Sequence, residues 1–475
     1  MQENAPFDLI VIGSGPGGYT AAIRASQLGL RTAIVEKRAA LGGTCLNVGC
    51  IPAKALLDTT ELYATIRDRA GQNGILLDNL RFDFVSIMKK KQAAVDQHTR
   101  GVEVLMRENR IIVVHGSASL SSPGNVAVRD EGGRETSLEG RAVLLATGSV
   151  PAALPSLPFN GKTIITSDEA LSLDAVPERL VIVGAGAVGI ELGCIWTRLG
   201  SRVTVVEMKD GILPGFDRQA CRLLTRILKS QGMELSVSTA VTGYTERKGA
   251  VEVSGTNEKG DEIAFVGNRV LVATGRRANL DGLGLDRLNV EVTDAGKVRV
   301  NERYETAVPG VFAIGDIIDG PMLAHKAGEE GIAVAELIAG RPGHVNYETI
   351  PNVVYTWPEL ASVGMTDETC TARGVPFRSG IFYFRANGRA TAADSKEGFV
   401  KIVAHKETDR VLGCTILGPW ASDLIHEIVT VMEFGGSAED IARTAHAHPT
   451  FSEVVKEAAM DVEGRAVNAV TVRKG

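Results

Sequence analysis

The sequence predicts an α/β fold in which two units of alternating strands and helices are followed by a smaller α+β domain. The chain has 475 residues, more than one hydrophobic core accommodates, so several domains are expected. Two glycine-rich loops, beginning at Gly13 and Gly184, stand in the same strand–loop–helix setting. From about residue 345 the pattern changes to strand-like runs and amphipathic helices without another such loop. We therefore expect two related α/β units and one further domain.

The first unit opens with the strand-like run Phe7–Ile12, followed at once by a G-x-G-x-x-G loop, an alanine-rich helical stretch and a second strand. Glycines in this loop let the backbone approach a pyrophosphate above the helix N-terminus. An acidic residue at the end of the second strand accepts hydrogen bonds from a ribose. The pattern predicts a Rossmann-like dinucleotide site at Gly13, Gly15, Gly18 and Glu36.

The second unit repeats this pattern with Gly184, Gly186 and Gly189. Its acidic residue, Glu207, lies 23 residues after the first loop glycine, the same separation as in the first unit. A carboxylate at this place favours NAD, because the 2′-phosphate of NADP is usually met by an arginine. The repeat predicts that the chain binds two dinucleotides, of which the second is NAD.

Two cysteines, Cys45 and Cys50, stand between a glycine pair and Ile51-Pro52, which reads as the start of a helix. A cysteine in a first helical turn lies beside the positive end of the helix dipole, which favours its thiolate. This arrangement favours a redox-active disulfide. A small structural bridge and half of a metal site are the alternatives, although zinc usually has a shorter cysteine spacing and a second ligand pair.

The segments that join the units carry further signals. Proline-rich residues 151–158 read as a linker, and two strand-like runs end alike in Ala-Thr-Gly, the first at Gly148 and the second at Gly275. Another run ends in Gly-Asp at Asp316. Beside a flavin, this carboxylate suits hydrogen bonds to the ribityl chain or pyrophosphate region, and a helix N-cap is the alternative.

The C-terminal part reads as an antiparallel α+β domain and a plausible dimerisation module. Near its end, His448 precedes a proline and is held out of helical geometry, while Glu453 lies in the following helix. The spacing would let the carboxylate orient and charge the imidazole, as a general base requires. A structural histidine is the alternative, and it is our expectation for the neighbouring His446.

The composition excludes several classes of protein. A net charge of −6 without a basic run argues against nucleic-acid binding. No apolar run is long enough to span a bilayer, and the first strand begins too early to leave room for a targeting peptide. Six cysteines are too few for a disulfide scaffold. We expect a cytoplasmic protein without a metal site or a membrane or nucleic-acid partner.

The segments GGTCLNVGCIPAK (42–54), GDIIDGPMLAHKA (315–327) and HAHPTFSEVVKEA (446–458) resemble those of the flavin-dependent disulfide oxidoreductases. The resemblance runs from Phe7 to Val470 and is greatest to members that oxidise protein-bound dihydrolipoamide with NAD⁺. It implies FAD on the first unit, NAD on the second, and a homodimer in which His448 reaches the disulfide of the other subunit. Its partners would be the lipoylated acyltransferases of 2-oxo acid dehydrogenase complexes or the lipoylated glycine cleavage protein.

The resemblance also implies a mechanism. His448, polarised by Glu453, takes a proton from a dithiol whose thiolate attacks Cys45, and Cys50 leaves as a thiolate beside the flavin. Lys54 would lie near the flavin and pair with Glu191. The cofactor-binding residues expected in all are Gly13, Gly15, Gly18, Glu36, Lys54, Gly116, Thr147, Gly148, Asp316, Met322, Leu323, Ala324, His325, Gly184, Gly186, Gly189, Glu191, Glu207, Val241 and Gly275.

The expected domains are an FAD-binding part at 1–150, an NAD-binding part at 151–275, a segment at 276–345 that completes the first, and a dimerisation domain at 346–475. Related glutathione and trypanothione reductases use NADPH, which Glu207 disfavours, and mercuric and large thioredoxin reductases need a C-terminal cysteine pair. Two alternatives remain open: the chain is another disulfide reductase of the family, or it is a flavoprotein scaffold of a multienzyme complex. Ala53 departs from the pattern, since close relatives commonly have serine there.

Overall fold

A computed structural model describes residues 5–469. Its N-terminal part is a parallel sheet in which β1 lies between β2 and β6 and β3 continues beyond β2, while β4, β5 and β6 form an antiparallel meander. Its elements are β1 (Phe7–Ile12), α1 (Pro16–Gln27), β2 (Thr32–Glu36), α2 (Gly43–Val48), α3 (Cys50–Arg69), η1 (Gly71–Asn73), α4 (Phe84–Glu108), β3 (Ile112–His115), β4 (Ser117–Ser122), β5 (Asn125–Arg129) and β6 (Glu135–Leu145).

The middle part has a second parallel sheet, in the order β11-β10-β9-β15-β8, and a three-stranded antiparallel sheet, β12-β13-β14. The chain enters this part through β7 and leaves it through β16, and these two strands pair antiparallel with Pro151 opposite Arg276. Its elements are β7 (Ser149–Pro151), β8 (Ile164–Ile165), α5 (Ser167–Ala170), β9 (Arg179–Val183), α6 (Ala187–Arg198), β10 (Arg202–Val206), α7 (Arg218–Ser230), β11 (Glu234–Ser236), β12 (Thr239–Arg247), β13 (Ala250–Asn257), β14 (Glu262–Gly267), β15 (Arg269–Val272) and β16 (Arg276–Ala278).

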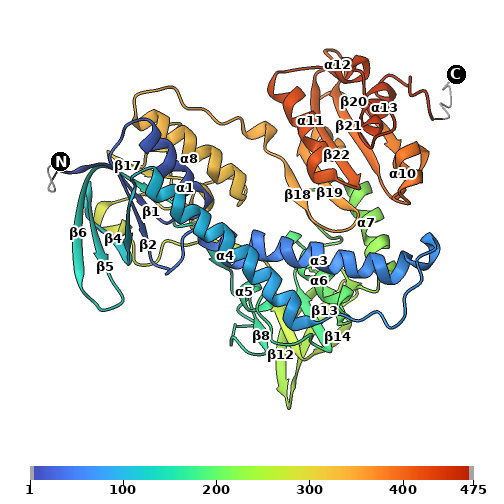
Figure 1. The fold of residues 1–475 in the computed structure, drawn as a ribbon, viewed down its shortest axis with the longest axis horizontal. Helices are drawn as coiled ribbons and strands as arrows, with labels where there is room; N and C mark the ends of the chain where they lie inside the picture. The colour runs from blue at the N-terminus through green and yellow to red at the C-terminus, as the bar shows by residue number, and fades with distance from the viewer. Residues whose placement is uncertain (1–4, 470–475) are drawn as a thin grey trace.

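The chain then returns to the first sheet, where β17 pairs parallel with β6. Helix α8 packs closely on α1 (Figure 1): a Cβ on Gly331 would lie only 2.5 Å from the Gly17 carbonyl oxygen, and a Cβ on Gly17 would lie 3.0 Å from the Ala327 carbonyl oxygen. The N-termini of α1 and α8 are therefore held near each other. The elements of this segment are η2 (Leu285–Leu288), β17 (Val311–Ala313), η3 (Gly315–Ile317) and α8 (Ala324–Ile338).

The C-terminal part is a five-stranded antiparallel sheet, β18-β19-β22-β21-β20, with helices packed on it. It forms a separate lobe joined to the first part by one extended segment (Figure 1). Its elements are η4 (Tyr347–Thr349), β18 (Asn352–Val354), β19 (Glu359–Gly364), α9 (Asp367–Arg373), β20 (Phe377–Tyr383), η5 (Phe384–Ala386), α10 (Gly388–Ala392), β21 (Phe399–His405), β22 (Val411–Gly418), α11 (Ala421–Glu433), α12 (Ala438–Arg443) and α13 (Glu453–Asp461).

The expected α/β fold class, with two related units and a C-terminal α+β domain, is confirmed. Element boundaries differ locally: α1 begins at Pro16 rather than at residue 19, because proline suits a first helical turn. Strand β19 was not expected, since four of its six residues are small or polar. Within residues 5–469, no helix combines the length and apolarity needed to cross a membrane, and no cluster of acidic, histidine or cysteine side chains suits a metal ion.

Candidate active site

The first glycine loop is shaped by close approaches of the backbone. Gly13 has a φ of +101°, and a Cβ on it would lie 2.5 Å from the Ala146 carbonyl oxygen. A Cβ on Gly18 would lie 1.9 Å from the Gly13 carbonyl oxygen, so α1 presses against the loop. Around Gly15, by contrast, the space is open to 4 Å. Gly13 and Gly18 thus let the loop fold tightly, and Gly15 leaves room above the N-terminus of α1.

Glu36 closes this loop from the end of β2. Its Oε2 accepts hydrogen bonds from the Ser14 hydroxyl at 2.6 Å and the Ser14 amide at 3.0 Å, and its Oε1 accepts from the Arg38 amide at 2.9 Å. The Gly42 amide donates to the Ser14 carbonyl at 3.0 Å. The carboxylate thus joins the glycine loop to the chain that leads toward Cys45.

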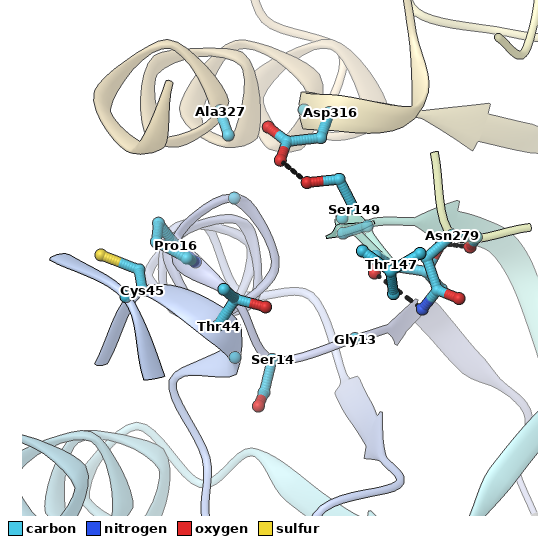
Figure 2. A pocket seen from close by; sticks show the side chains of 18 of the residues that line it. Gly13, Ser14, Pro16, Thr44, Cys45, Thr147, Ser149, Asn279, Asp316 and Ala327 are labelled. Atoms are coloured by element: carbon cyan, nitrogen blue, oxygen red, sulfur yellow. Dashed lines mark hydrogen bonds between the residues drawn. The ribbon is translucent and has the colours of Figure 1, made fainter. Parts of the chain in front are cut away.

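A cavity of about 500 Å³ opens above this loop. Figure 2 shows Cys45 and Thr44 on one side of it, and Asp316, Ser149 and Thr147 on another. The volume lies within the usual range for a cofactor site. Of the expected residues, the following line the cavity: Gly13, Gly15, Glu36, Cys45, Cys50, Lys54, Gly116, Thr147, Gly148, Glu191, Asp316, Met322 and Ala324.

This cavity fits a dinucleotide such as FAD. The N-caps of α1 and α8, Gly15 and Leu323, make no capping hydrogen bond through a side chain. Residues of both first turns, among them Pro16 and Ala324, line the cavity. Free N–H groups at the start of a helix attract phosphate groups, and the open space around Gly15 admits one.

Asp316 lies at the cavity wall within η3 and not at a helix N-cap, so that alternative for it is wrong. Its Oδ2 accepts a hydrogen bond from the Ser149 hydroxyl at 2.5 Å, and Ser149 Oγ accepts from Arg276 Nε at 2.7 Å. Thr147 Oγ1 donates to the Asn279 carbonyl at 2.7 Å (Figure 2). Ser149, Arg276 and Asn279 were not predicted from the sequence, because their positions depend on the pairing of strands β7 and β16.

Cys50 is the first residue of α3, and Cys45 lies in the short helix α2, with both as thiols at the cavity wall. A hydrogen bond from Cys45 lowers the pKa of Cys50 to about 7; burial opposes this, and the Lys54 charge supports it. Donating that hydrogen bond raises the pKa of Cys45, as does burial. Cys50 is therefore the sulfur that the site stabilises as a thiolate.

Lys54 follows Cys50 by one helical turn and pairs with Glu191 of α6, Nζ to Oε2 at 2.8 Å. The Glu191 side chain is only 8 % exposed, and its Oε1 accepts from the Tyr355 amide at 3.0 Å. Lys54 Nζ also lies 4.3 Å from the centre of the Tyr355 ring. Helix α3 is thus fixed to both the middle part and the C-terminal lobe, and Lys54 pairs with Glu191 as the family resemblance implies.

The second glycine loop repeats the first. Gly184 has a φ of +109°, and a Cβ on it would lie 2.5 Å from the Ala273 carbonyl oxygen, while Gly186 again faces open space. Glu207 Oε2 accepts from the Ala185 amide at 2.7 Å, and its Oε1 accepts from the Lys209 amide at 2.9 Å. The loop has the form that accepts a second dinucleotide.

His448 and Glu453 meet in the C-terminal lobe, away from the cavity. His448 Nδ1 lies 2.8 Å from Glu453 Oε1, and the imidazole is 77 % exposed. Burial raises the pKa of Glu453, but hydrogen bonds from the Thr450 amide and from His448 outweigh this effect, so that the pKa is lowered overall. His446 instead is 5 % exposed and contacts Glu427 at 2.8 Å, which agrees with a structural role. Within one chain, His448 is thus free to face a second molecule.

Five of the residues expected to bind a cofactor lie elsewhere than at the cavity wall or the second loop. Gly18 packs beneath the first loop, and Leu323 is the N-cap of α8. His325 Nε2 lies 2.8 Å from the Pro351 carbonyl oxygen. Gly275 has a φ of +143° at the end of β15, and Val241 packs against a core of the middle part.

The fold and this geometry are those of a pyridine nucleotide-disulphide oxidoreductase. The family model of that description matches residues 7–331, and the dimerisation-domain model of the same family matches residues 350–459. The chain belongs to this family. FAD and NAD, the cofactors predicted from the sequence, are therefore confirmed as those of the enzyme.

Characterised relatives cover nearly the whole chain. A mitochondrial dihydrolipoyl dehydrogenase of Pisum sativum is 46% identical over 95% of this chain and 91% of its own length. A leghemoglobin reductase of Vigna unguiculata is 47% identical over 95% and 87%. Dihydrolipoyl dehydrogenase 3 of Pseudomonas putida is 46% identical over 97% and 99%. The crystal structure of LpdA from Mycobacterium tuberculosis has a TM-score of 0.87 at 28% identity, covering 95% of this chain and 98% of that one.

Proposed function

We propose that this enzyme oxidises protein-bound dihydrolipoamide to lipoamide and reduces NAD⁺ to NADH. The observation that carries the proposal is the Cys45–Cys50 pair at the wall of the FAD cavity, with the pKa of Cys50 lowered to about 7. The relatives named dihydrolipoyl dehydrogenase support the choice of substrate, since they span almost the whole chain at 46% identity.

The two cysteines have different tasks. In the resting enzyme they form a disulfide, and a substrate thiolate attacks Cys45, so that Cys50 leaves as the more stable thiolate. The second substrate sulfur then attacks the mixed disulfide, which releases the cyclic disulfide product and leaves Cys45 as a thiol. Bound at the cavity wall beside Cys50, FAD would supply the acceptor for the electron pair of this dithiol, and NAD⁺ at the second loop would be the final hydride acceptor. The hydrogen bond from Cys45 and the nearby Lys54 hold the charge on Cys50.

His448 acts as the general base, with Glu453 orienting its ring and stabilising its charged form. In one chain this pair is exposed and outside the cavity, which supports a homodimer whose partner subunit supplies the base to each cysteine pair. The dimerisation-domain match at residues 350–459 supports the dimer itself.

The remaining assignments complete the proposal. Residues 1–150 and 276–345 bind FAD, residues 151–275 bind NAD through the loop at Gly184 and the carboxylate of Glu207, and residues 346–475 form the dimer interface. The lipoylated partner is the acyltransferase of a 2-oxo acid dehydrogenase complex or the glycine cleavage protein. We also propose a cytoplasmic location, although the Pisum sativum relative is named as mitochondrial.

The test is NADH formation from dihydrolipoamide by the purified yellow protein, with NAD⁺ and NADP⁺ compared side by side. Rapid reduction of NAD⁺ with little reduction of NADP⁺ is the expected result. A protein that leaves dihydrolipoamide untouched but oxidises NADH with another disulfide, or with leghemoglobin as the name of the Vigna unguiculata relative suggests, would overturn the substrate assignment.

A further inference from the structure

Behind the cavity wall lies a charged pair to which the mechanism above gives no task. Lys326 and Glu330, one turn apart on α8, are both 0 % exposed and lie 3.0 Å apart, Nζ to Oε1. Removing two charges completely from water is costly unless hydrogen bonds satisfy them. Apolar residues would fill the same space at a lower cost in folding free energy. The contacts of this pair therefore indicate what the two charges do.

Both charges hold the same backbone residue. Lys326 Nζ donates to the Gly315 carbonyl at 3.0 Å, and Glu330 Oε2 accepts from the Gly315 amide at 2.7 Å. Gly315 has a φ of +76°, lines the cavity, and immediately precedes Asp316. Lys326 also donates to the Asp319 carbonyl at 3.2 Å. The peptide groups on either side of Gly315 are thus fixed from α8 by two fully buried side chains.

The same network reaches the beginning of the C-terminal lobe. Tyr347 of η4 donates to Glu330 Oε1 at 2.7 Å, and its oxygen lies 3.2 Å from that of Tyr304. Thr349 of the same short helix donates to Glu433 of α11 at 2.7 Å. Tyr347 contacts Glu330 without touching Gly315, so it offers a variant that perturbs the network and spares the turn.

We infer that Lys326 and Glu330 are positioning residues for FAD: they fix the Gly315 turn and so place the Asp316 carboxylate at the cavity wall. They touch neither the reacting sulfurs nor the cavity, and they act through the backbone that they hold. The inference rests on the proposal that Asp316 binds FAD. It gives the buried Lys326–Glu330 pair the role of holding the turn that carries Asp316.

The main experiment compares the holoenzyme with the double variant Lys326→Met/Glu330→Leu, which removes both contacts to Gly315 and leaves no unpaired charge. Replacing both members of a buried pair usually preserves stability, whereas removing one does not. We expect FAD to leave the double variant at least tenfold faster, followed by the rise in flavin fluorescence, and the visible circular dichroism of bound FAD to change. The Tyr347→Phe control should release FAD within about twofold of the parent rate.

A double variant that folds, keeps the flavin spectrum and releases FAD within twofold of the parent rate would overturn the inference. So would equal acceleration by Tyr347→Phe. If the double variant does not fold, Glu330→Gln and Glu330→Leu are compared, since glutamine keeps an acceptor for the Gly315 amide. The inference requires slower FAD release from the glutamine variant, and equal rates refute it. A parent protein purified without FAD would instead contradict the proposed function.

Discussion

The two glycine loops of this enzyme have almost the same backbone but different surroundings. In both, the first glycine meets a carbonyl oxygen at 2.5 Å from its missing Cβ, and the third position of the loop faces open space. In the first unit a serine hydroxyl adds a hydrogen bond to Glu36, whereas Ala185 offers Glu207 only its amide. The first unit also continues into α3, which begins at Cys50. The shared backbone has the form that accepts a dinucleotide, and only the first loop is followed by the cysteine pair proposed to react with the dithiol.

Replacing Cys50 with serine tests the largest difference between the units. We expect Cys50→Ser to abolish oxidation of dihydrolipoamide and to remove the long-wavelength absorbance of the two-electron-reduced enzyme. Oxidation of NADH by ferricyanide should continue, because it needs FAD and the second loop but not the disulfide. Loss of both activities would show that the two units are not separable in this way, and survival of the absorbance would reverse the roles of Cys45 and Cys50.

His448→Gln removes the proposed general base, which belongs to the C-terminal lobe and to neither dinucleotide unit. Dihydrolipoamide turnover should fall by a factor of about 10² or more, the usual scale of general-base catalysis, while FAD stays bound. His446→Gln is the matched control, since that ring contacts Glu427 and is buried. The measurement is the steady-state turnover of dihydrolipoamide by the two variants. Near-normal activity of His448→Gln would end its assignment as the base.

The open glycines allow the two loops to be perturbed separately. Neither Gly15 nor Gly186 has a neighbour within 4 Å of a Cβ, and their φ angles of −64° and −74° suit alanine. Gly15→Ala should weaken FAD retention by about tenfold or more, and Gly186→Ala should raise the KM for NAD⁺ similarly with normal flavin content, because each methyl group occupies pyrophosphate space. Gly388→Ala, also in open space, is the control. Equal loss of FAD in both loop variants would contradict the assignment.

The pKa of Cys50 predicts a pH dependence confined to the first unit. A thiol whose pKa is lowered to about 7 is mostly thiolate above pH 7 and becomes protonated as the pH falls below it. The thiolate absorbance of the two-electron-reduced enzyme should therefore fall through a midpoint near pH 7. Lys54→Met should move this midpoint upward, since the lysine charge stabilises the thiolate. A midpoint unchanged by the substitution would show that Lys54 contributes little.

Ala53→Ser should have the smallest effect. Ala53 lies between the cysteine turn and Lys54 and lines the cavity. A serine there adds at most a neutral hydrogen bond, worth about 0.5–1.5 kcal/mol, so turnover should stay within about tenfold. A larger change in kcat would show that a side-chain hydroxyl at this position tunes the flavin.

The features predicted correctly from the sequence are local ones. The glycine loops, the position of Cys50 at the start of α3 and Glu453 at the start of α13 each follow from residues within a few positions of one another. The contacts of Glu191, Ser149 and Lys326 do not follow from local residue patterns, because their partners come from distant parts of the chain or from a turn whose shape depends on packing. Only the family resemblance had paired Lys54 with Glu191.

The antiparallel pair of β7 and β16 has a consequence for how this protein can be rebuilt. The chain departs at Pro151 and comes back at Arg276, directly opposite in the ladder, so the intervening segment has its two ends side by side. A module with adjacent ends can be cut out, bridged by a short linker or exchanged for a homologue without rerouting the surrounding chain. We therefore expect exchange of the proposed NAD-binding segment between β7 and β16 to change the coenzyme preference while the rest of the chain is kept.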